Sequence, residues 1–189
     1  MSQSDAREIV AIISNPANAV EPQRFLKDAE RLVRPGMYAW WADDEARLVL
    51  GAPLDVQLGP LLYVGQAGAT KWPSGKRSSA TLASRIGRQH IRGNARSSTF
   101  RRTVSALLFD QLSLVHAGGG RLDRPSNSTV SVWIDRHLRV AAAPFDDRDA
   151  LGRVEKAILD ELDPPLNLSK CTPSHVRNRL TALRARLST

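Results

Sequence analysis

The sequence predicts a mixed α/β fold, because three strand-like apolar runs are separated by segments with helical periodicity. The runs at 37–42, 61–66 and 138–143 predict strands, and the first of them is rich in aromatic residues. Apolar residues recur at helical spacing in the segments 5–13, 22–34 and 81–91. A chain of 189 residues has the length of one domain with an extension.

In the N-terminal half, residues typical of turns and helix caps mark the ends of these elements. Pro35-Gly36 ends the second helix, and a turn is expected at 43–45, before a short strand at 47–50. The segments 51–60 and 67–80 predict loops, and Ser78-Ser79 provides helix N-caps before the helix at 81–91.

The C-terminal half is mostly helical. A helix restarts at 97–99 and is expected to reach about residue 115, before the polar loop that begins at 118–120. The segment 129–134 is β-branched, which favours a strand, although Ser128 could equally cap a helix that ends near residue 137. Asp146 or Asp147 is expected to cap a helix that stops before Pro164, and a basic helix follows at 174–187.

The net charge of +8 comes from one part of the chain. No Asp or Glu occurs from residue 56 to residue 109, which is the pattern of a surface that binds a polyanion. The alternative is a pair of helices with solvated basic faces. We expect every basic residue of this block except Arg85 to contact nucleic acid: Lys71, Lys76, Arg77, Arg88, Arg92, Arg96, Arg101 and Arg102.

Other features of the composition exclude several classes of protein. The sequence contains no run of about 18 apolar residues, so it predicts no membrane span. The single Cys171 excludes an internal disulfide and a thiolate zinc site. The first residues lack the pattern of a signal peptide, so we expect a cytoplasmic protein.

Glu155 is the most unusual residue in the sequence. It lies on the same helical stripe as Leu151, Ile158 and Leu162, where a carboxylate is costly unless it is paired or binds a cation. Both interpretations stay open: a buried ion pair, or a ligand of a hard divalent cation, which commonly takes one or two carboxylates together with phosphate and water.

Two tyrosines and two basic side chains are further candidates. Tyr38 and Tyr63 each lie in an apolar strand, as core tyrosines do, but two tyrosines facing a metal and an arginine could activate a nucleophile. Arg85, between Leu82 and Ile86, could clamp a transition state or be a surface arginine. His90 could tune or deprotonate a tyrosine, or cap its helix.

Taken together, these residues resemble the GIY-YIG nuclease superfamily. The matching segments, spanning about 35–168, are Pro35-Gly36-Met37-Tyr38, Leu62-Tyr63-Val64-Gly65, the arginine helix at 82–86, and the segment 155–167. In that last segment the metal-binding Glu of the family precedes a Pro-Leu-Asn turn. Some members carry a His four residues after the Arg; here Gln89 holds that position and His90 follows it, on a different face unless the helix contains a bulge.

The resemblance implies a small α/β domain (35–168) with a central, mainly antiparallel three-stranded sheet, flanked by an N-terminal helical extension (1–34) and a basic C-terminal helix (169–189) packed on it. It also implies that Glu155 holds one Mg²⁺ or Mn²⁺, that Tyr38 activates water with Tyr63 close by, that Arg85 stabilises the transition state, and that Asn167 orients site groups and phosphate.

The expected function is therefore a metal-dependent endonuclease that cuts nucleic acid, with double-stranded DNA favoured by the resemblance and a homodimer possible. The alternative is a nucleic-acid-binding module that is idle or needs a partner.

Overall fold

The computed structural model describes residues 3–187 as one α/β body around a three-stranded sheet. The strands are β1 (Gly36–Ala42), β2 (Leu61–Ala67), β5 (Leu138–Pro144) and the short pair β3 (Thr70–Lys71) and β4 (Lys76–Arg77). The α-helices are α1 (Gln3–Ile13), α2 (Pro22–Lys27), α3 (Asp44–Gly51), α4 (Thr99–Leu107), α5 (Arg124–His137), α6 (Leu151–Leu162) and α7 (His175–Ala185). Short 3₁₀ turns span Pro16–Asn18, Ala29–Leu32 and Ala52–Leu54, and a π-helix, η4, spans Ala83–Ile91.

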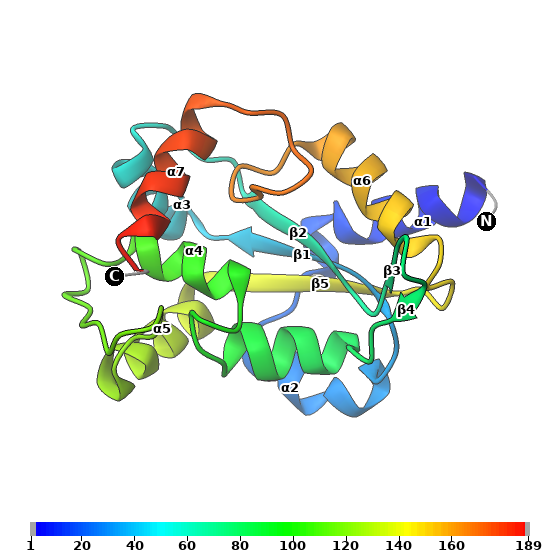
Figure 1. Cartoon of the computed structure of the whole chain (residues 1–189), viewed down its shortest axis with the longest axis horizontal. Coiled ribbons are helices and arrows are strands. Elements are labelled where there is room, and N and C mark those ends of the chain that lie inside the picture. Colours follow the sequence, from blue (N-terminus) through cyan, green and yellow to red (C-terminus); the bar gives the residue numbers. More distant parts are fainter. Residues whose placement is uncertain (1–2, 188–189) are drawn as a thin grey trace.

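The strand order is β2-β1-β5, and both pairings are antiparallel (Figure 1). This confirms the expected fold class. Glycine begins β1 because a Cβ on Gly36 would lie 2.3 Å from the carbonyl oxygen of Ala143 on β5. The close pairing of β1 with β5 therefore depends on Gly36.

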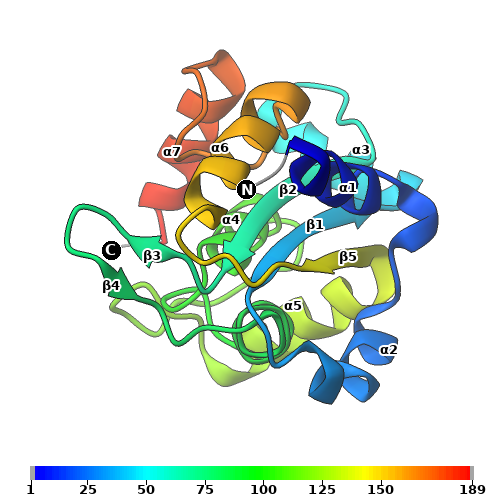
Figure 2. The same ribbon diagram turned by 90° about the vertical axis from the view of Figure 1, so that its right-hand side faces the viewer.

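Alternate residues of β1 face two separate cores, because helices cover both faces of the sheet (Figure 2). Met37 and Trp41 face α1 and α6, whereas Tyr38 and Trp40 face η4 and α4. Tyr38 is thereby directed into the core that contains the basic helix.

Several predicted elements are confirmed. These are the helices at 5–13, 81–91 and 174–187, the three strands of the main sheet, and the helix that stops before Pro164. Asp147 accepts the Ala150 N–H at 2.9 Å before α6, whereas Asp146 pairs with Arg34. The segment 129–134 is helical as part of α5, which starts earlier than expected because Asp123 accepts the Ser126 N–H at 2.8 Å.

Four local predictions were wrong. Residues 47–50 belong to α3, because the Asp43 carboxylate accepts the Ala46 N–H at 2.7 Å and caps a helix where a turn and a strand were expected. The helix at 22–34 breaks after Lys27 and continues as a 3₁₀ turn. The helix that restarts near residue 99 ends at Leu107, and the loop at 67–80 contains the β3–β4 hairpin. None of the helices within residues 3–187 has the length and apolarity to cross a lipid bilayer.

Candidate active site

The two glycine-tyrosine motifs come together on adjacent strands. Tyr38 of β1 pairs with Gly65 of β2, and a Cβ on Gly65 would lie 2.4 Å from the Tyr38 hydroxyl oxygen. Glycine at position 65 therefore gives the Tyr38 side chain room to cross the neighbouring strand. Tyr63 lies two residues earlier on β2, and its ring stacks beside that of Tyr38, with centroids 6.4 Å apart. The motif spacing thus brings two phenol groups to one place.

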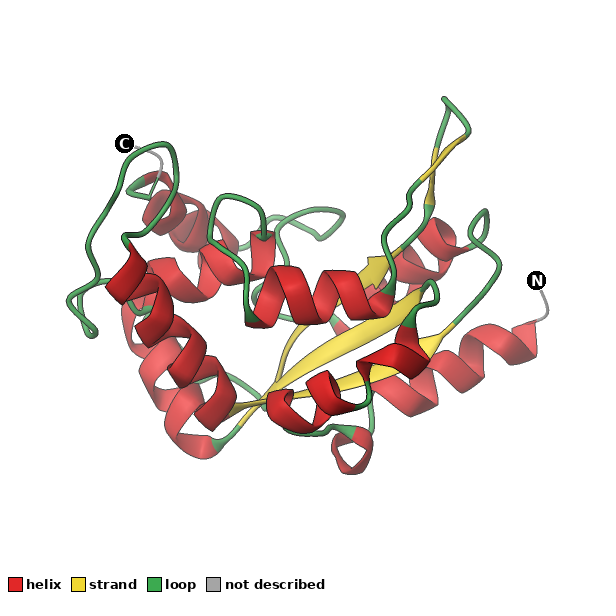
Figure 3. Cartoon of the chain, turned by 90° about the horizontal axis from the view of Figure 1, so that it is seen from below, coloured by secondary structure: helices red, strands yellow, loops and turns green. Residues whose placement is uncertain are grey.

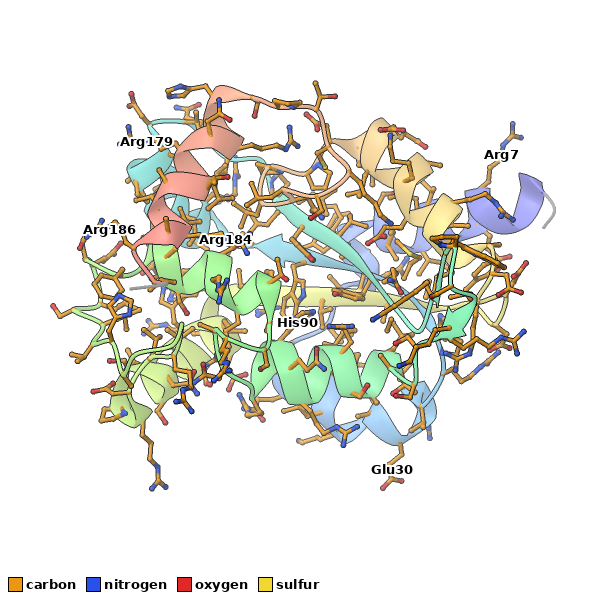
Figure 4. The ribbon with its side chains drawn as sticks, in the orientation of Figure 1. Arg7, Glu30, His90, Arg179, Arg184 and Arg186 are labelled. Carbon is orange, nitrogen blue, oxygen red and sulfur yellow. The ribbon has the colours of Figure 1, made fainter. Side chains whose placement is uncertain are left out.

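His90 reaches this place because η4 is a π-helix. Its bonding runs from each N–H to the carbonyl five residues earlier, as in the 3.0 Å bond from the Arg92 N–H to the Gly87 oxygen. Residues five apart, such as Arg85 and His90, then share a face. The Tyr38 Oη lies 2.7 Å from His90 Nε2, and Figure 4 shows His90 between this helix and the sheet.

A chain of polar contacts continues behind His90. Its Nδ1 lies 2.6 Å from Ser98 Oγ, which also accepts the Arg101 N–H and thereby caps α4. We assign the Ser98 hydroxyl proton to His90 Nδ1, since no other acceptor for it lies within the described residues. The neutral imidazole then carries its proton on Nε2 and donates it to the Tyr38 oxygen.

Burial keeps these groups uncharged. Burial lowers the pKa of His90 to about 3, and the nearby Arg85 and Arg101 contribute to that decrease. Burial also raises the pKa of Tyr38 well above its usual range, and the pKa of Tyr63 to about 12. The neighbouring Tyr63 phenol adds to the increase in the pKa of Tyr38. Tyr63 is the more exposed of the two, since Tyr38 is only 2% exposed.

Arg85 supplies positive charge to the same group of residues. Its field lowers the pKa of both tyrosines. One terminal nitrogen donates to Gln89 Oε1 at 2.6 Å, while the buried Nε has no hydrogen-bond partner within the described residues. Gln89, at the position where some GIY-YIG proteins carry histidine, therefore orients the arginine.

Glu155, on α6, lies within electrostatic reach of the tyrosine pair. Its charge raises the pKa of both phenols, and its side chain is 15% exposed on α6. Glu155 Oε2 accepts a hydrogen bond from Lys170 Nζ at 2.5 Å. One of the two interpretations left open by the sequence, an ion pair, is therefore present within the described residues, and Lys170 is the partner.

A divalent cation fits this carboxylate. Oε1 has no hydrogen-bond partner within residues 3–187, and Lys170 is 45% exposed, so its ammonium group can move away. The same part of the chain contains no group of three or more His, Cys, Asp or Glu that could enclose a metal. Such a site suits Mg²⁺, which binds through one or two carboxylates together with substrate phosphate and water.

Asn167 supports the site from within the fold. Its side-chain amide accepts the Val64 N–H at 2.9 Å and donates to the Val64 oxygen at 2.7 Å. Asn167 is 5% exposed, so its amide orients β2 next to Tyr63 and is not available to a phosphate. The expectation that Asn167 orients site groups agrees with this arrangement, whereas a contact with phosphate does not.

The basic residues predicted to bind nucleic acid differ in exposure. Lys71, Lys76, Arg77, Arg88, Arg92 and Arg96 are exposed, and Arg102 is half-buried. Arg92 pairs with Asp135 at 2.8 Å, and Arg77 lies 3.8 Å from Asp149.

The prediction that Arg101 contacts nucleic acid was wrong, because its side chain is fully buried. It donates to the carbonyl oxygens of His90 (3.2 Å) and Ile91 (3.0 Å) and to Ser131 Oγ (2.8 Å). Arg101 therefore closes the C-terminal end of the π-helix and cannot reach a nucleic acid.

Three neighbours of the site were not singled out in the sequence. Ser98 was expected only to start a helix, and Lys170 meets Glu155 only because the chain turns back after α6. Arg184 lies on the side of α7 that faces α4, while Arg179 and Arg186 lie on its outer side (Figure 4). The charge of Arg184 lowers the pKa of Tyr63. The sequence shows only that Arg184 belongs to a basic helix and does not indicate that this helix packs near Tyr63.

Comparison with known families agrees with this geometry. A family described as the GIY-YIG catalytic domain matches residues 36–186, which is most of the chain. Neither the curated proteins nor the solved structures contain a significant match. Because the family match includes both tyrosine motifs, the arginine helix and α6, the chain belongs to the GIY-YIG catalytic-domain family, whose members are nucleases.

Proposed function

We propose that the protein is an endonuclease that hydrolyses phosphodiester bonds of nucleic acid, with DNA as the favoured substrate, using one divalent metal ion at Glu155. The observation that carries this proposal is that Tyr38 and Tyr63 stack on adjacent strands, close enough to Arg85 and Glu155 for both charges to change the pKa of the two phenols. Each of the four supplies a charge or proton-transfer group that phosphodiester hydrolysis needs.

We assign Tyr63 as the general base: its hydroxyl first loses a proton to solvent, and the resulting phenolate takes the proton of the attacking water. The sequence favoured Tyr38, but Tyr38 is 2% exposed and Tyr63 is half-buried. The hydrogen bonds run from Ser98 to His90 and on to Tyr38, whose ring lies beside that of Tyr63. The positive charges of Arg85 and Arg184 lower the pKa of Tyr63 and therefore stabilise a negative charge on its oxygen.

Arg85 and Glu155 complete the mechanism. The Arg85 guanidinium is half-buried beside the tyrosines and can bind a non-bridging phosphate oxygen, whose negative charge grows in the transition state. Mg²⁺ or Mn²⁺ held by Glu155 would polarise the scissile phosphate and stabilise the leaving oxygen. In the structure Lys170 pairs with Glu155, and this pair would have to open for Glu155 to hold a metal ion.

A plasmid assay tests the proposal directly. Supercoiled plasmid is incubated with the protein in Mg²⁺, in Mn²⁺ and in EDTA. We expect nicking or linearisation only with metal, and Glu155→Gln should lower the rate by about three orders of magnitude, because several kcal/mol of charge stabilisation are lost. Glu161→Gln on the exposed face of the same helix is the matched control and should cut normally.

The second candidate is a nucleic-acid-binding module without activity of its own. The observation that favours it is Lys170, whose ammonium group occupies Glu155 Oε2. This candidate predicts that the protein binds nucleic acid with an affinity that depends on salt but not on Mg²⁺. It also predicts that the plasmid stays uncut in every condition. Cleavage by purified protein that requires both metal and Glu155 rules it out. A linear product from the first cut would in addition support a homodimer that cuts both strands.

A further inference from the structure

The β3–β4 hairpin stands out from the body of the molecule (Figures 2 and 3). Its base is firmly held. One terminal nitrogen of Arg148 donates to the carbonyl oxygens of Gly68 and Ser78, both at 2.8 Å, and Thr70 bonds to Asp149 at 2.5 Å. Arg148 and Asp149 immediately precede α6, the helix that carries Glu155. The hairpin is therefore hydrogen-bonded to the segment that leads into the helix of the proposed metal ligand.

The tip of this hairpin carries an exposed tryptophan. Trp72 is 64% exposed, whereas the other three tryptophans of the chain, Trp40, Trp41 and Trp133, are 9% exposed or less. Within residues 3–187 the Trp72 ring has no stacking or cation–π contact. A large flat apolar side chain is thus presented to solvent on a supported projection, where packing does not account for it.

The surroundings of Trp72 are cationic. Lys71 and Lys76 flank the turn, are exposed, and have no acidic partner within the described part of the chain. Arg77 follows on β4. An aromatic ring between such cations matches a nucleotide, which offers a flat base to the ring and a phosphate to the lysines. An apolar protein surface would leave the lysines without partners.

We propose that Trp72 stacks on an unpaired base of the substrate while Lys71 and Lys76 bind the phosphates beside it. The preferred substrate would then be a nucleic acid with unpaired bases near the cut, such as an overhang, a flap or a gap, rather than a continuous duplex. Insertion of the ring into intact duplex would first have to unstack two base pairs, whereas a base that is already open needs no such step. This inference rests on the proposed function.

The test is a binding titration in EDTA, which separates recognition from cleavage. Tryptophan fluorescence is followed while a short single-stranded oligonucleotide, a blunt duplex or a duplex with an overhang is added. Because the other tryptophans are buried, Trp72 dominates any change. We expect quenching of Trp72 by the first and third ligands only. The affinities are measured by the fluorescence anisotropy of a dye on each nucleic acid, which also follows the blunt duplex and the Trp72→Ala variant. Trp72→Ala should weaken binding of the single strand and of the overhang roughly tenfold, the scale of one stacked base, without changing that of the blunt duplex.

Two control variants separate stacking from charge and from general surface effects. Lys71→Ala should weaken binding of all three nucleic acids and reduce its salt dependence. Leu48→Ala, which removes another exposed apolar side chain on α3, should change nothing.

Unchanged binding of the single strand by Trp72→Ala overturns the inference, and so does an equal loss for the single strand and the blunt duplex. If Trp72 discriminates as expected but Glu155→Gln cuts plasmid normally, the proposed metal site fails and the stacking site stands.

Discussion

The inner and outer halves of the site are built in opposite ways. The inner half, Ser98, His90 and Tyr38, is at most 2% exposed, and its hydrogen bonds form one continuous chain. The outer half, Glu155 and Lys170, is held by a single contact between side chains that are 15% and 45% exposed. Fixed neutral dipoles thus lie on the buried side of the reacting oxygen, and charges that can rearrange lie on its solvent side. The difference indicates an inner half that is preorganised and an outer half that changes when substrate binds.

The largest expected difference is in kcat, between a variant without the Tyr63 hydroxyl and a variant without the Tyr38 hydroxyl. Tyr63→Phe should lower kcat by about 10²–10³, because the group that takes the water proton is lost. Tyr38→Phe should lower kcat by only about tenfold, because it removes the hydrogen bond to His90 beside Tyr63 but leaves the Tyr63 hydroxyl, Arg85 and Arg184 in place. Both variants keep the ring, so thermal unfolding temperatures close to that of the wild type are the control. A larger loss in Tyr38→Phe would return the catalytic assignment to Tyr38.

The buried inner half also predicts a pH dependence of stability. The pKa of His90 is about 3 in the folded protein and about 6.5 in an unfolded chain, so between these values the unfolded state binds the extra proton. Stability should therefore fall as the pH drops from 6.5 toward 3, with a contribution from His90 of about 1.4 kcal/mol per pH unit below pH 6. Denaturant unfolding between pH 7 and about pH 4 measures this slope. His90→Gln should unfold with a shallower slope, and an unchanged slope would mean that His90 is not buried in its neutral form.

The outer half predicts the smallest effect. Lys170→Ala removes the cation that competes for Glu155, so the metal concentration that gives the half-maximal rate should fall by about two- to fivefold, the scale of a partly exposed ion pair. Lys156→Ala, which breaks the contact with Asp160 on the same helix, is the control and should leave this concentration unchanged. A loss of cleavage in Lys170→Ala would instead place the lysine on the substrate phosphate.

The sequence predicted the residues of the site better than their contacts. The order of the motifs was sufficient to propose Tyr38, Tyr63, Arg85 and Glu155 as candidates, since each lies in an element whose apolar pattern is clear, and their role in a site stays a proposal. The register of His90 was not predictable, because a π-helix uses the same residues as an α-helix and differs only in its bonding. Arg101 was assigned to the surface from its charge alone, although its fixed fork of donors also suits buried carbonyl oxygens.

Errors in the fold have similar local causes. The helix α3 was missed because Asp43 is equally typical of a turn and of an N-cap, and the choice depends on Ala46 and Leu50 packing into the core. The division of the chain into an extension (1–34), a nuclease domain (35–168) and a C-terminal helix (169–189) stays a prediction, as do the cytoplasmic location and the homodimer.

The central claim is that Tyr63 and Glu155 act on the same reacting phosphate, and a double-mutant cycle tests it most directly. Single-turnover cleavage rates are measured for the wild type, Tyr63→Phe, Glu155→Gln and the double variant. Groups that act as one catalytic unit give non-additive losses, so the account predicts that the double variant is about as slow as the slower single variant. Losses that multiply in the double variant would show that the two residues act independently, and would contradict a single active site built on both.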